Sequence, residues 1–97
     1  MSITAFTELN VKPEAVADLK AILKEILPDT RSFDGCRGVE VYSDKENDSI
    51  IMLLSQWDSR DHHARYVEWR AETGVLDRMG VTLAGPPVGR YFEQVDI

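Results

Sequence analysis

The sequence predicts an α+β protein with a ferredoxin-like βαββαβ fold, in which two helices cover one face of a four-stranded antiparallel sheet. Two observations support this prediction. Segments with the two-residue period of strands and segments with the 3.6-residue period of helices follow one another in that order along the chain. The 97 residues are also the size of one domain, so residues 1–97 are expected to share a single core.

The first strand is expected over Ile3–Val11, where side chains alternate between an apolar face and a more polar face. The first helix follows Pro13, a residue that suits the first helical position. Its apolar side chains fall on one arc of a helical wheel, as is typical of a helix packed on a sheet: Val16, Leu19, Ile22, Leu23, Ile26 and Leu27. Pro28 interrupts the helical hydrogen bonds, so a turn or a short irregular helix is expected over residues 29–38.

The second and third strands are expected over Arg37–Ser43 and Ser49–Trp57, with a charged connection of ordinary hairpin length between them. Every residue from Ile50 to Leu54 is apolar, which is typical of a strand buried on both faces. The helices of this fold cover only one face of the sheet. A second copy of the chain is the simplest cover for the other face, so we predict a homodimer built sheet against sheet.

The second helix is expected to begin after Ser59, whose hydroxyl can cap it, and to end at Gly74. A short helix over Val75–Val81 and a last strand over Val88–Val95 complete the fold. The wheel of the second helix predicts a face toward the core that carries His63, Ala64, Val67 and Ala71. The flank of this helix then carries His62, Tyr66 and Trp69.

Trp57, His63 and Tyr66 are the residues best placed to act on a ligand. A pocket between the second helix and the sheet would have aromatic walls, with an imidazole and a phenol to orient a flat ligand. Packing alone would also account for Trp57. The alternative interpretation of His63 is a histidine at the edge of the core whose hydrogen bonds are satisfied within the protein. His62 is expected at the surface, while Tyr66 and Trp69 are equally typical of dimer contacts.

Charge and composition exclude several other classes of function. The net charge of -6 opposes binding to a polyanionic backbone, so nucleic acid is not an expected partner. No apolar run is long enough to span a membrane, and no signal peptide is seen at the start, so the cytoplasm is the expected location. His62 and His63 project about 100° apart on a helix, which does not suit a shared metal, and Cys36 is expected to be a small buried group.

Five short motifs follow one another along nearly the whole chain: Val11-Lys12-Pro13-Glu14, Phe33-Asp34-Gly35-Cys36, Gln56-Trp57-Asp58-Ser59, Tyr66-Val67-Glu68-Trp69-Arg70 and Gly85-Pro86-Pro87. In order and spacing they resemble the antibiotic biosynthesis monooxygenase family of dimeric α+β barrel proteins. The resemblance implies a protomer whose sheet pairs with that of its twin. It also implies a monooxygenase that oxidises a quinol or a polycyclic phenol with molecular oxygen and requires no metal, flavin or other cofactor.

The resemblance also implies a site. Trp57 stands where these enzymes have a strand-end tryptophan, and His63 stands six residues later, where they can have a substrate-binding tyrosine. We therefore predict His63 and Trp57 as catalytic residues, and Trp57, His63, Tyr66 and Met79 as contacts of a small aromatic substrate. The alternatives are a ligand-binding or stress-related dimer without turnover and a haem-degrading relative. The latter is disfavoured because no histidine follows His63.

Overall fold

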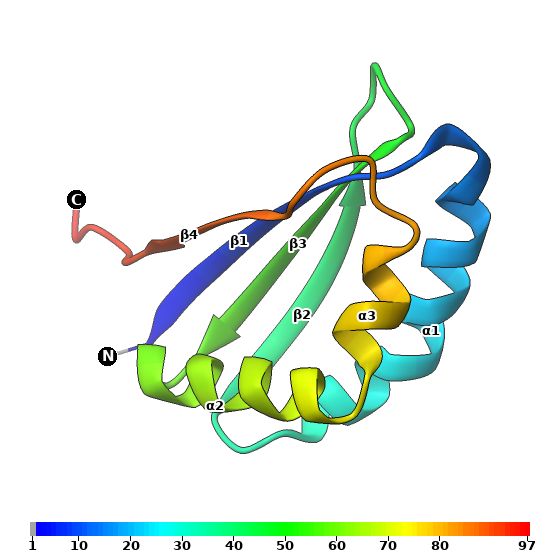
Figure 1. The fold of residues 1–97 in the computed structure, drawn as a ribbon. Coiled ribbons are helices and arrows are strands. Elements are labelled where there is room, and N and C mark those ends of the chain that lie inside the picture. The colour runs from blue at the N-terminus through cyan, green and yellow to red at the C-terminus, as the bar shows by residue number, and fades with distance from the viewer. Residues whose placement is uncertain (1) are drawn as a thin grey trace.

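The computed structural model describes residues 2–97 and confirms the ferredoxin-like fold, with a four-stranded antiparallel sheet and the helices on one of its faces (Figure 1). The elements are β1 (Ile3–Asn10), a 3-10 turn (Pro13–Ala15), α1 (Val16–Ser32), β2 (Cys36–Ser43), β3 (Ile50–Trp57), α2 (Arg60–Glu72), α3 (Val75–Gly80) and β4 (Val88–Phe92). Each predicted strand and helix therefore occurs, with bounds that differ by a few residues.

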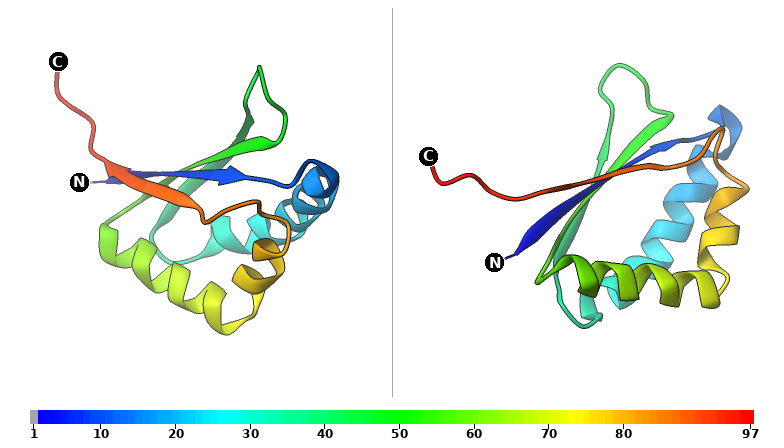
Figure 2. Two further views of the ribbon diagram at one scale, coloured as in Figure 1. Left: turned by 45° about the horizontal axis from the view of Figure 1, so that its top comes forward. Right: turned by 60° about the vertical axis from the view of Figure 1, so that its left-hand side comes forward.

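The strands lie in the order β2-β3-β1-β4, so β1 and β3 are central and β4 is an edge strand. β1 pairs with β3 over its whole length, from Ile3 opposite Trp57 to Asn10 opposite Ile50. β4 pairs only with Thr4–Glu8 of β1 and ends at Phe92, three residues before the predicted end. Figure 2 shows the chain after β4 running away from the sheet.

The core lies between the inner face of the sheet and the helices. α1 buries the residues predicted from its wheel that lie nearest the sheet: Leu19, Leu23, Ile26 and Leu27. Leu9 of β1 and Ile51 of β3 meet them and are 1% exposed. In both views of Figure 2, α1, α2 and α3 lie on the same side of the sheet, and α2 crosses the end of α1.

The prediction that the first helix ends at Pro28 is wrong, because α1 continues through Pro28 to Ser32. Proline removes one backbone donor and bends a helix but leaves the flanking hydrogen bonds intact. Pro28 is exposed, whereas Ile26, Leu27 and Thr30 on either side of it are buried. The burial of these neighbours requires the helical path to continue, and it outweighs the cost of the proline.

The prediction for the inner face of α2 is right for His63 and Val67, which lie on the side toward the sheet, and wrong for Ala64 and Ala71. Ala64 and Ala71 are exposed and Val67 is 38% exposed, whereas Arg70 is the one buried residue of the helix. The helix is turned so that Tyr66, Trp69 and Arg70 point inward. Their rings and the aliphatic stem of arginine cover more apolar area than two alanines, so this orientation buries more surface.

Candidate active site between the second helix and the sheet

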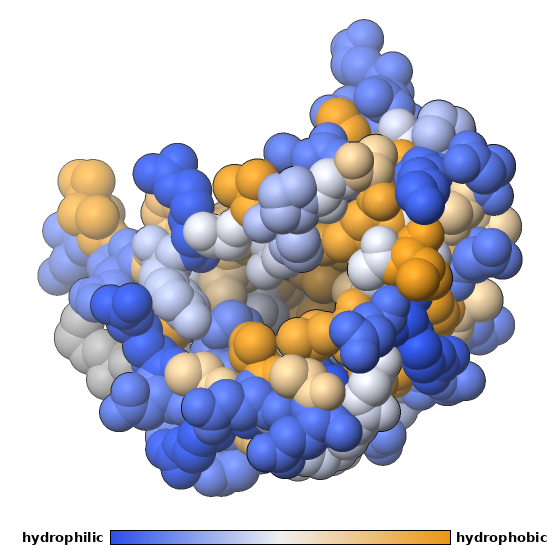
Figure 3. Space-filling model, in the orientation of Figure 1, coloured by the Kyte–Doolittle hydropathy of each residue, from blue (hydrophilic) through white to orange (hydrophobic). Residues whose placement is uncertain are grey.

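A cavity of about 250 Å³ lies between the inner face of the sheet and the three helices. Its walls are mostly apolar. The exposed side chains of Val67, Leu76 and Pro87 border it, so it opens between α2, α3 and the segment that leads into β4. Figure 3 shows the hollow in the middle of this face of the molecule.

The four residues predicted to bind a substrate all line this cavity. Trp57 comes from the end of β3, His63 and Tyr66 come from α2, and Met79 comes from α3. Trp57 is fully buried and Met79 is 9% exposed, so both form walls that solvent does not reach. The fold thus brings together side chains that lie up to 22 residues apart in the sequence.

Trp57 contributes its ring to the cavity. Its indole nitrogen donates a hydrogen bond of 2.9 Å to Oγ of Ser55, two residues earlier on the same face of β3. The centre of its ring lies 5.1 Å from that of Tyr66 and 5.3 Å from that of His63. With its N–H engaged, Trp57 can stack against a flat ligand.

His63 is held by a residue that the sequence analysis did not single out. Its Nδ1 lies 2.6 Å from the hydroxyl of Tyr91, which points inward from the edge strand β4. The guanidinium of Arg60 lies over the Tyr91 ring, 4.8 Å from its centre. Nε2 of His63 makes no hydrogen bond within residues 2–97. Burial lowers the pKa of His63 below its ordinary value of 6.5, so the imidazole is neutral at pH 7.

A polar cluster closes the inner end of the cavity. The Tyr66 hydroxyl lies 2.5 Å from Oγ1 of Thr30 and accepts a hydrogen bond of 2.9 Å from Nε of Arg70. Nη2 of Arg70 donates to the backbone oxygen of Ile26 at 2.8 Å and to Thr30 Oγ1 at 2.9 Å. Arg70 therefore joins α2 to α1 and forms part of the cavity wall.

Sequence reasoning missed Arg70, Thr30 and Tyr91. A signal for Arg70 exists, because it follows His63 by seven residues and Tyr66 by four, which places all three on adjoining parts of one helix face. Because arginine is seldom buried, the position of Arg70 on that face did not indicate a residue of the site. Thr30 and Tyr91 lie far from the second helix in sequence, and only the folded chain brings them to it.

Two aromatic residues of α2 do not line the cavity. The prediction of a surface position for His62 is wrong, because its side chain is 25% exposed, packs against Gly35 and places Nδ1 2.7 Å from Oγ of Ser59. Trp69 packs on Phe33, with ring centres 5.2 Å apart. These contacts join α2 to the connection between α1 and β2.

Residues 2–97 contain neither a cluster of metal ligands nor a membrane-spanning helix. No three His, Cys, Asp or Glu side chains in this range gather into a group able to hold a metal ion. None of its helices is long and apolar enough to cross a membrane. Cys36, which is predicted to be buried, is half-buried, and this partial burial raises the pKa of its thiol.

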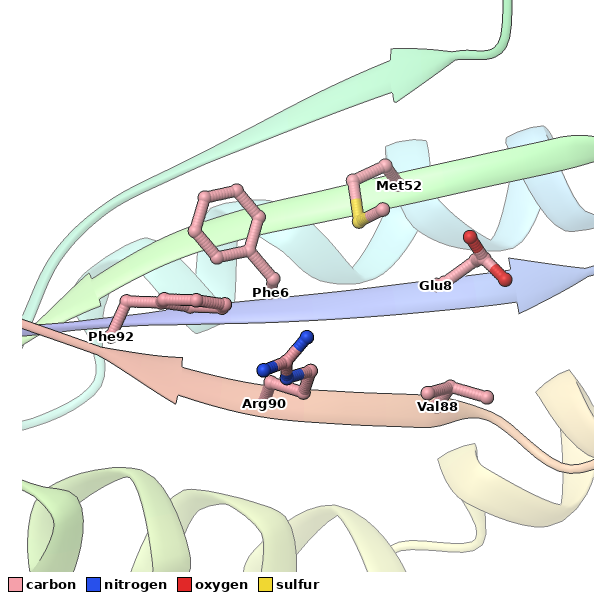
Figure 4. Close-up of a pocket in the computed structure, with 6 residues that line it drawn as sticks. All are labelled: Phe6, Glu8, Met52, Val88, Arg90 and Phe92. Carbon is pink, nitrogen blue, oxygen red and sulfur yellow. The ribbon is translucent and has the colours of Figure 1, made fainter.

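A second, open hollow of about 540 Å³ lies on the outer face of the sheet. Figure 4 shows the six side chains that line it, all standing on β1, β3 and β4: Phe6, Glu8, Met52, Val88, Arg90 and Phe92. The rings of Phe6 and Phe92 meet edge to face with their centres 4.9 Å apart. No helix within residues 2–97 covers this face, which leaves apolar groups in contact with solvent.

Comparisons with known proteins agree with the fold. The sequence model of the antibiotic biosynthesis monooxygenase family matches residues 2–71. The Rv0793 protein of Mycobacterium tuberculosis is 31% identical to this chain in an alignment that covers 67% of the chain and 69% of that protein.

Two solved structures are similar to the whole chain. A conserved protein from Methanosarcina mazei Go1 has a TM-score of 0.89 and 19% identity, covering 98% of this chain and 94% of that one. A structure of an antibiotic biosynthesis monooxygenase has a TM-score of 0.87 and 14% identity, covering 97% and 99%. At such identities the two structures establish similarity of fold.

Proposed function

The chain belongs to the antibiotic biosynthesis monooxygenase family, and we propose that it oxidises a quinol or a phenolic aromatic compound with molecular oxygen. The observation that carries this proposal is the cavity itself. It is mostly apolar, it is walled by Trp57 and Tyr66, and it brings a neutral imidazole to the same space. Such a site can hold a flat ring and remove a proton from it.

The proposed reaction needs no group beyond the substrate, oxygen and a base. His63 takes a proton from the phenol, and the electron-rich anion passes one electron to O₂. The substrate radical and superoxide then combine to form a C–O bond at a carbon that bears a hydrogen, and His63 returns its proton to the outer peroxide oxygen, which gives a hydroperoxide. Loss of water leaves a carbonyl, so one oxygen atom enters the product and the other leaves as water together with the two hydrogens lost from the substrate. The apolar walls favour this sequence because they exclude competing water.

The residues of the cavity take distinct roles in this proposal. Nε2 of His63 is the base, because Nδ1 is engaged by Tyr91. The rings of Trp57 and Tyr66 hold the aromatic plane of the substrate, and Met79 contacts the substrate from the side of α3. The volume of about 250 Å³ lies below the roughly 300–1,000 Å³ of pockets for drug-sized ligands, which favours a substrate of one or two fused rings.

The assembly we propose is a homodimer formed through the outer face of the sheet. The exposed Phe92 and Val88 and the half-buried Phe6 and Met52 offer the apolar surface that a partner would bury. Glu8 and Arg90 give the same face one charge of each sign, so a two-fold copy can set opposite charges against each other.

The test is aerobic turnover of benzoquinols and naphthoquinols by purified protein treated with a chelator, with the three-ring anthrone included to test the expected size limit. We expect oxygen consumption and, with ¹⁸O₂, one labelled oxygen atom per product molecule. His63→Ala is expected to lower kcat by about 10²-fold or more, the usual contribution of a general base. Glu68→Ala is the control on the same helix, because Glu68 is exposed and does not line the cavity. An unchanged rate in His63→Ala would overturn the assigned role.

A different outcome would point to the alternative function. Aromatic compounds that bind in the cavity while no oxygen is consumed, across quinols, anthrones and naphthols, would indicate a ligand-binding dimer without turnover. Calorimetric binding and an oxygen electrode, run on the same protein preparation, separate the two functions.

A further inference from the structure

We propose that the cavity selects aromatic ligands that carry an anionic oxygen, and that the guanidinium of Arg70 binds this oxygen. The inference deepens the proposed function and rests on it for the aromatic nature of the ligand. It concerns the inner end of the same cavity, opposite the edge strand that positions His63.

Arg70 carries a buried charge that no carboxylate offsets. Its side chain lines the cavity and the residue is 4% exposed. Within residues 2–97, ion pairs join Arg37 to Asp58, His62 to Asp34 and Arg78 to Glu25, and none involves Arg70. A guanidinium keeps its positive charge inside proteins, and a buried charge without a counter-charge is unfavourable. An anion in the cavity would supply the counter-charge that the chain does not.

The hydrogen bonds of Arg70 leave one nitrogen free. Nε donates to Tyr66, and Nη2 donates to Ile26 and Thr30, all of which are neutral acceptors. Nη1 makes no hydrogen bond to any residue from 2 to 97. In this range no fully buried side-chain nitrogen or oxygen lacks a partner, so Nη1 retains accessible surface. Its two N–H groups are therefore available to a ligand oxygen.

The distance between His63 and Arg70 along α2 sets the expected length of the ligand. His63 and Arg70 are seven residues apart, which is about 10 Å along a helix axis, with Tyr66 between them. A ligand whose phenolic oxygen reaches His63 while an anionic oxygen reaches Arg70 spans about two fused rings. The small volume of the cavity points to the same size.

The contacts of Arg70 also connect α2 to α1, but this connection does not require a charge. Neutral donors can make hydrogen bonds to the Ile26 carbonyl and to the Thr30 and Tyr66 hydroxyls. The rings of Trp69 and Tyr66, whose centres lie 4.4 and 5.2 Å from the guanidinium carbon, also face the charge, but like the hydrogen-bond acceptors they are neutral. An anionic ligand would supply the full counter-charge that these groups do not.

The experiment compares 6-hydroxy-2-naphthoate with 6-hydroxy-2-naphthamide, two ligands of one shape that differ in charge. Binding is measured by calorimetry without oxygen, so no turnover occurs. We expect the wild-type protein to bind the acid about tenfold more tightly or better. In Arg70→Met the ratio should fall to about one while the affinity for the amide stays nearly the same. Arg78→Met removes an exposed arginine that pairs with Glu25 and should leave the ratio unchanged.

A second arm identifies the source of the anionic oxygen. A naphthol without a carboxylate is titrated across its own pKa, and tighter binding on ionisation, lost in Arg70→Met, would show that the phenolate itself is the anion. Arg70→Lys, which keeps a positive charge, should retain part of either preference and serves as a second variant if Arg70→Met does not fold. Equal affinity of the wild-type protein for acid and amide, with no gain on ionisation of the naphthol, would overturn the inference.

The two proposals fail in different ways. Preference for the acid with no oxygen consumption on any substrate would refute the monooxygenase and leave the anion site intact. Turnover of neutral substrates without any preference for anions would refute the anion site alone.

Discussion

Tyr91 engages one ring nitrogen of His63, and the direction of this hydrogen bond decides what the imidazole can do. If Tyr91 donates to Nδ1, the single proton of the neutral ring sits on Nε2, which then donates to the ligand. If Nδ1–H donates to Tyr91, Nε2 is free to accept a proton. The proposed base requires the second arrangement, and the 2.6 Å contact is compatible with it.

The lowered pKa of His63 leads to a pH prediction. Only the neutral imidazole can accept a proton, so kcat/KM should fall as pH drops through the pKa of His63, which burial places below 6.5. The measurement is a pH–rate profile of wild type and His63→Gln with one substrate. An acid limb with its midpoint above 6.5, or one that persists unchanged in His63→Gln, would contradict the assignment.

The same shift in pKa affects stability. The unfolded chain has the ordinary histidine pKa of about 6.5 and the folded chain a lower one, so the unfolded state binds more protons between the two values. The free energy of unfolding should therefore decrease as pH falls through that window and show no contribution from His63 above it. Urea titrations of wild type and His63→Gln at a series of pH values would isolate this contribution.

The sequence allowed us to predict those site residues whose side-chain chemistry indicates a function. Trp57, His63, Tyr66 and Met79 all line one cavity, as residue chemistry and family resemblance led us to expect. Arg70 could not be found in this way, because its burial depends on three hydrogen bonds to α1 and to Tyr66 that no local pattern reveals.

Among the elements, α2 depends on a close contact with the connection that leads into β2. Gly35 has a φ of 87°, in the left-handed region, and its α-carbon lies against the ring of His62. An added methyl group at this position would lie 2.3 to 2.6 Å from three carbons of His62, including its Cβ. The Cβ is fixed to the helix backbone, so the side chain cannot simply turn away.

Gly35→Ala is therefore expected to destabilise the protein by about 2–4 kcal/mol, from the left-handed backbone and from the steric overlap together. Chemical denaturation measures the loss. Gly80→Ala is the control, because a methyl group there meets nothing within 4 Å. In the double variant Gly35→Ala/His62→Ala the overlap with the two ring carbons is removed while the overlap with Cβ remains, so only part of the loss should be recovered. A Gly35→Ala protein as stable as the wild type would refute this account.

The elements were largely predictable because their periodic patterns are strong. The alternation in β1 and the apolar arc of α1 each identify one face, and the structure buries that face. Two predictions failed where tertiary packing outweighed local signals. Pro28 does not end α1, and α2 is turned toward its aromatic residues because these bury more area than Ala64 and Ala71.

At the scale of the whole molecule, the outer face of the sheet is the surface through which we propose that two copies of the chain assemble. Met52 and Leu54 of β3 are only half-buried in the single chain, although every residue from Ile50 to Leu54 is apolar. Phe92 is 41% exposed and Val88 52%. Contiguous apolar groups of this kind mark an interaction surface in a small protein, and a second copy presents the same surface in return.

We expect the wild-type protein to have twice the chain mass of 11.0 kDa in size-exclusion chromatography with light scattering. Phe6→Glu should shift it toward the monomer, because the dimer would bury a carboxylate, whereas the monomer can set it opposite Arg90 on β4. Val81→Glu changes an exposed residue at the end of α3, 71% accessible, and should leave the dimer intact. A wild-type monomer at all concentrations tested would refute the proposed assembly.

The edge strand β4 has a consequence for how often the site is complete. β4 pairs with five residues of β1, Thr4–Glu8, and its own five residues are all exposed. Elements with few buried apolar contacts open locally more readily than the core does. Detachment of β4 would leave Trp57, Tyr66 and Met79 around the cavity and would take Tyr91 away from His63. Such an open protein would hold a formed pocket without an oriented base, so the local stability of this one strand would set the fraction of molecules able to react.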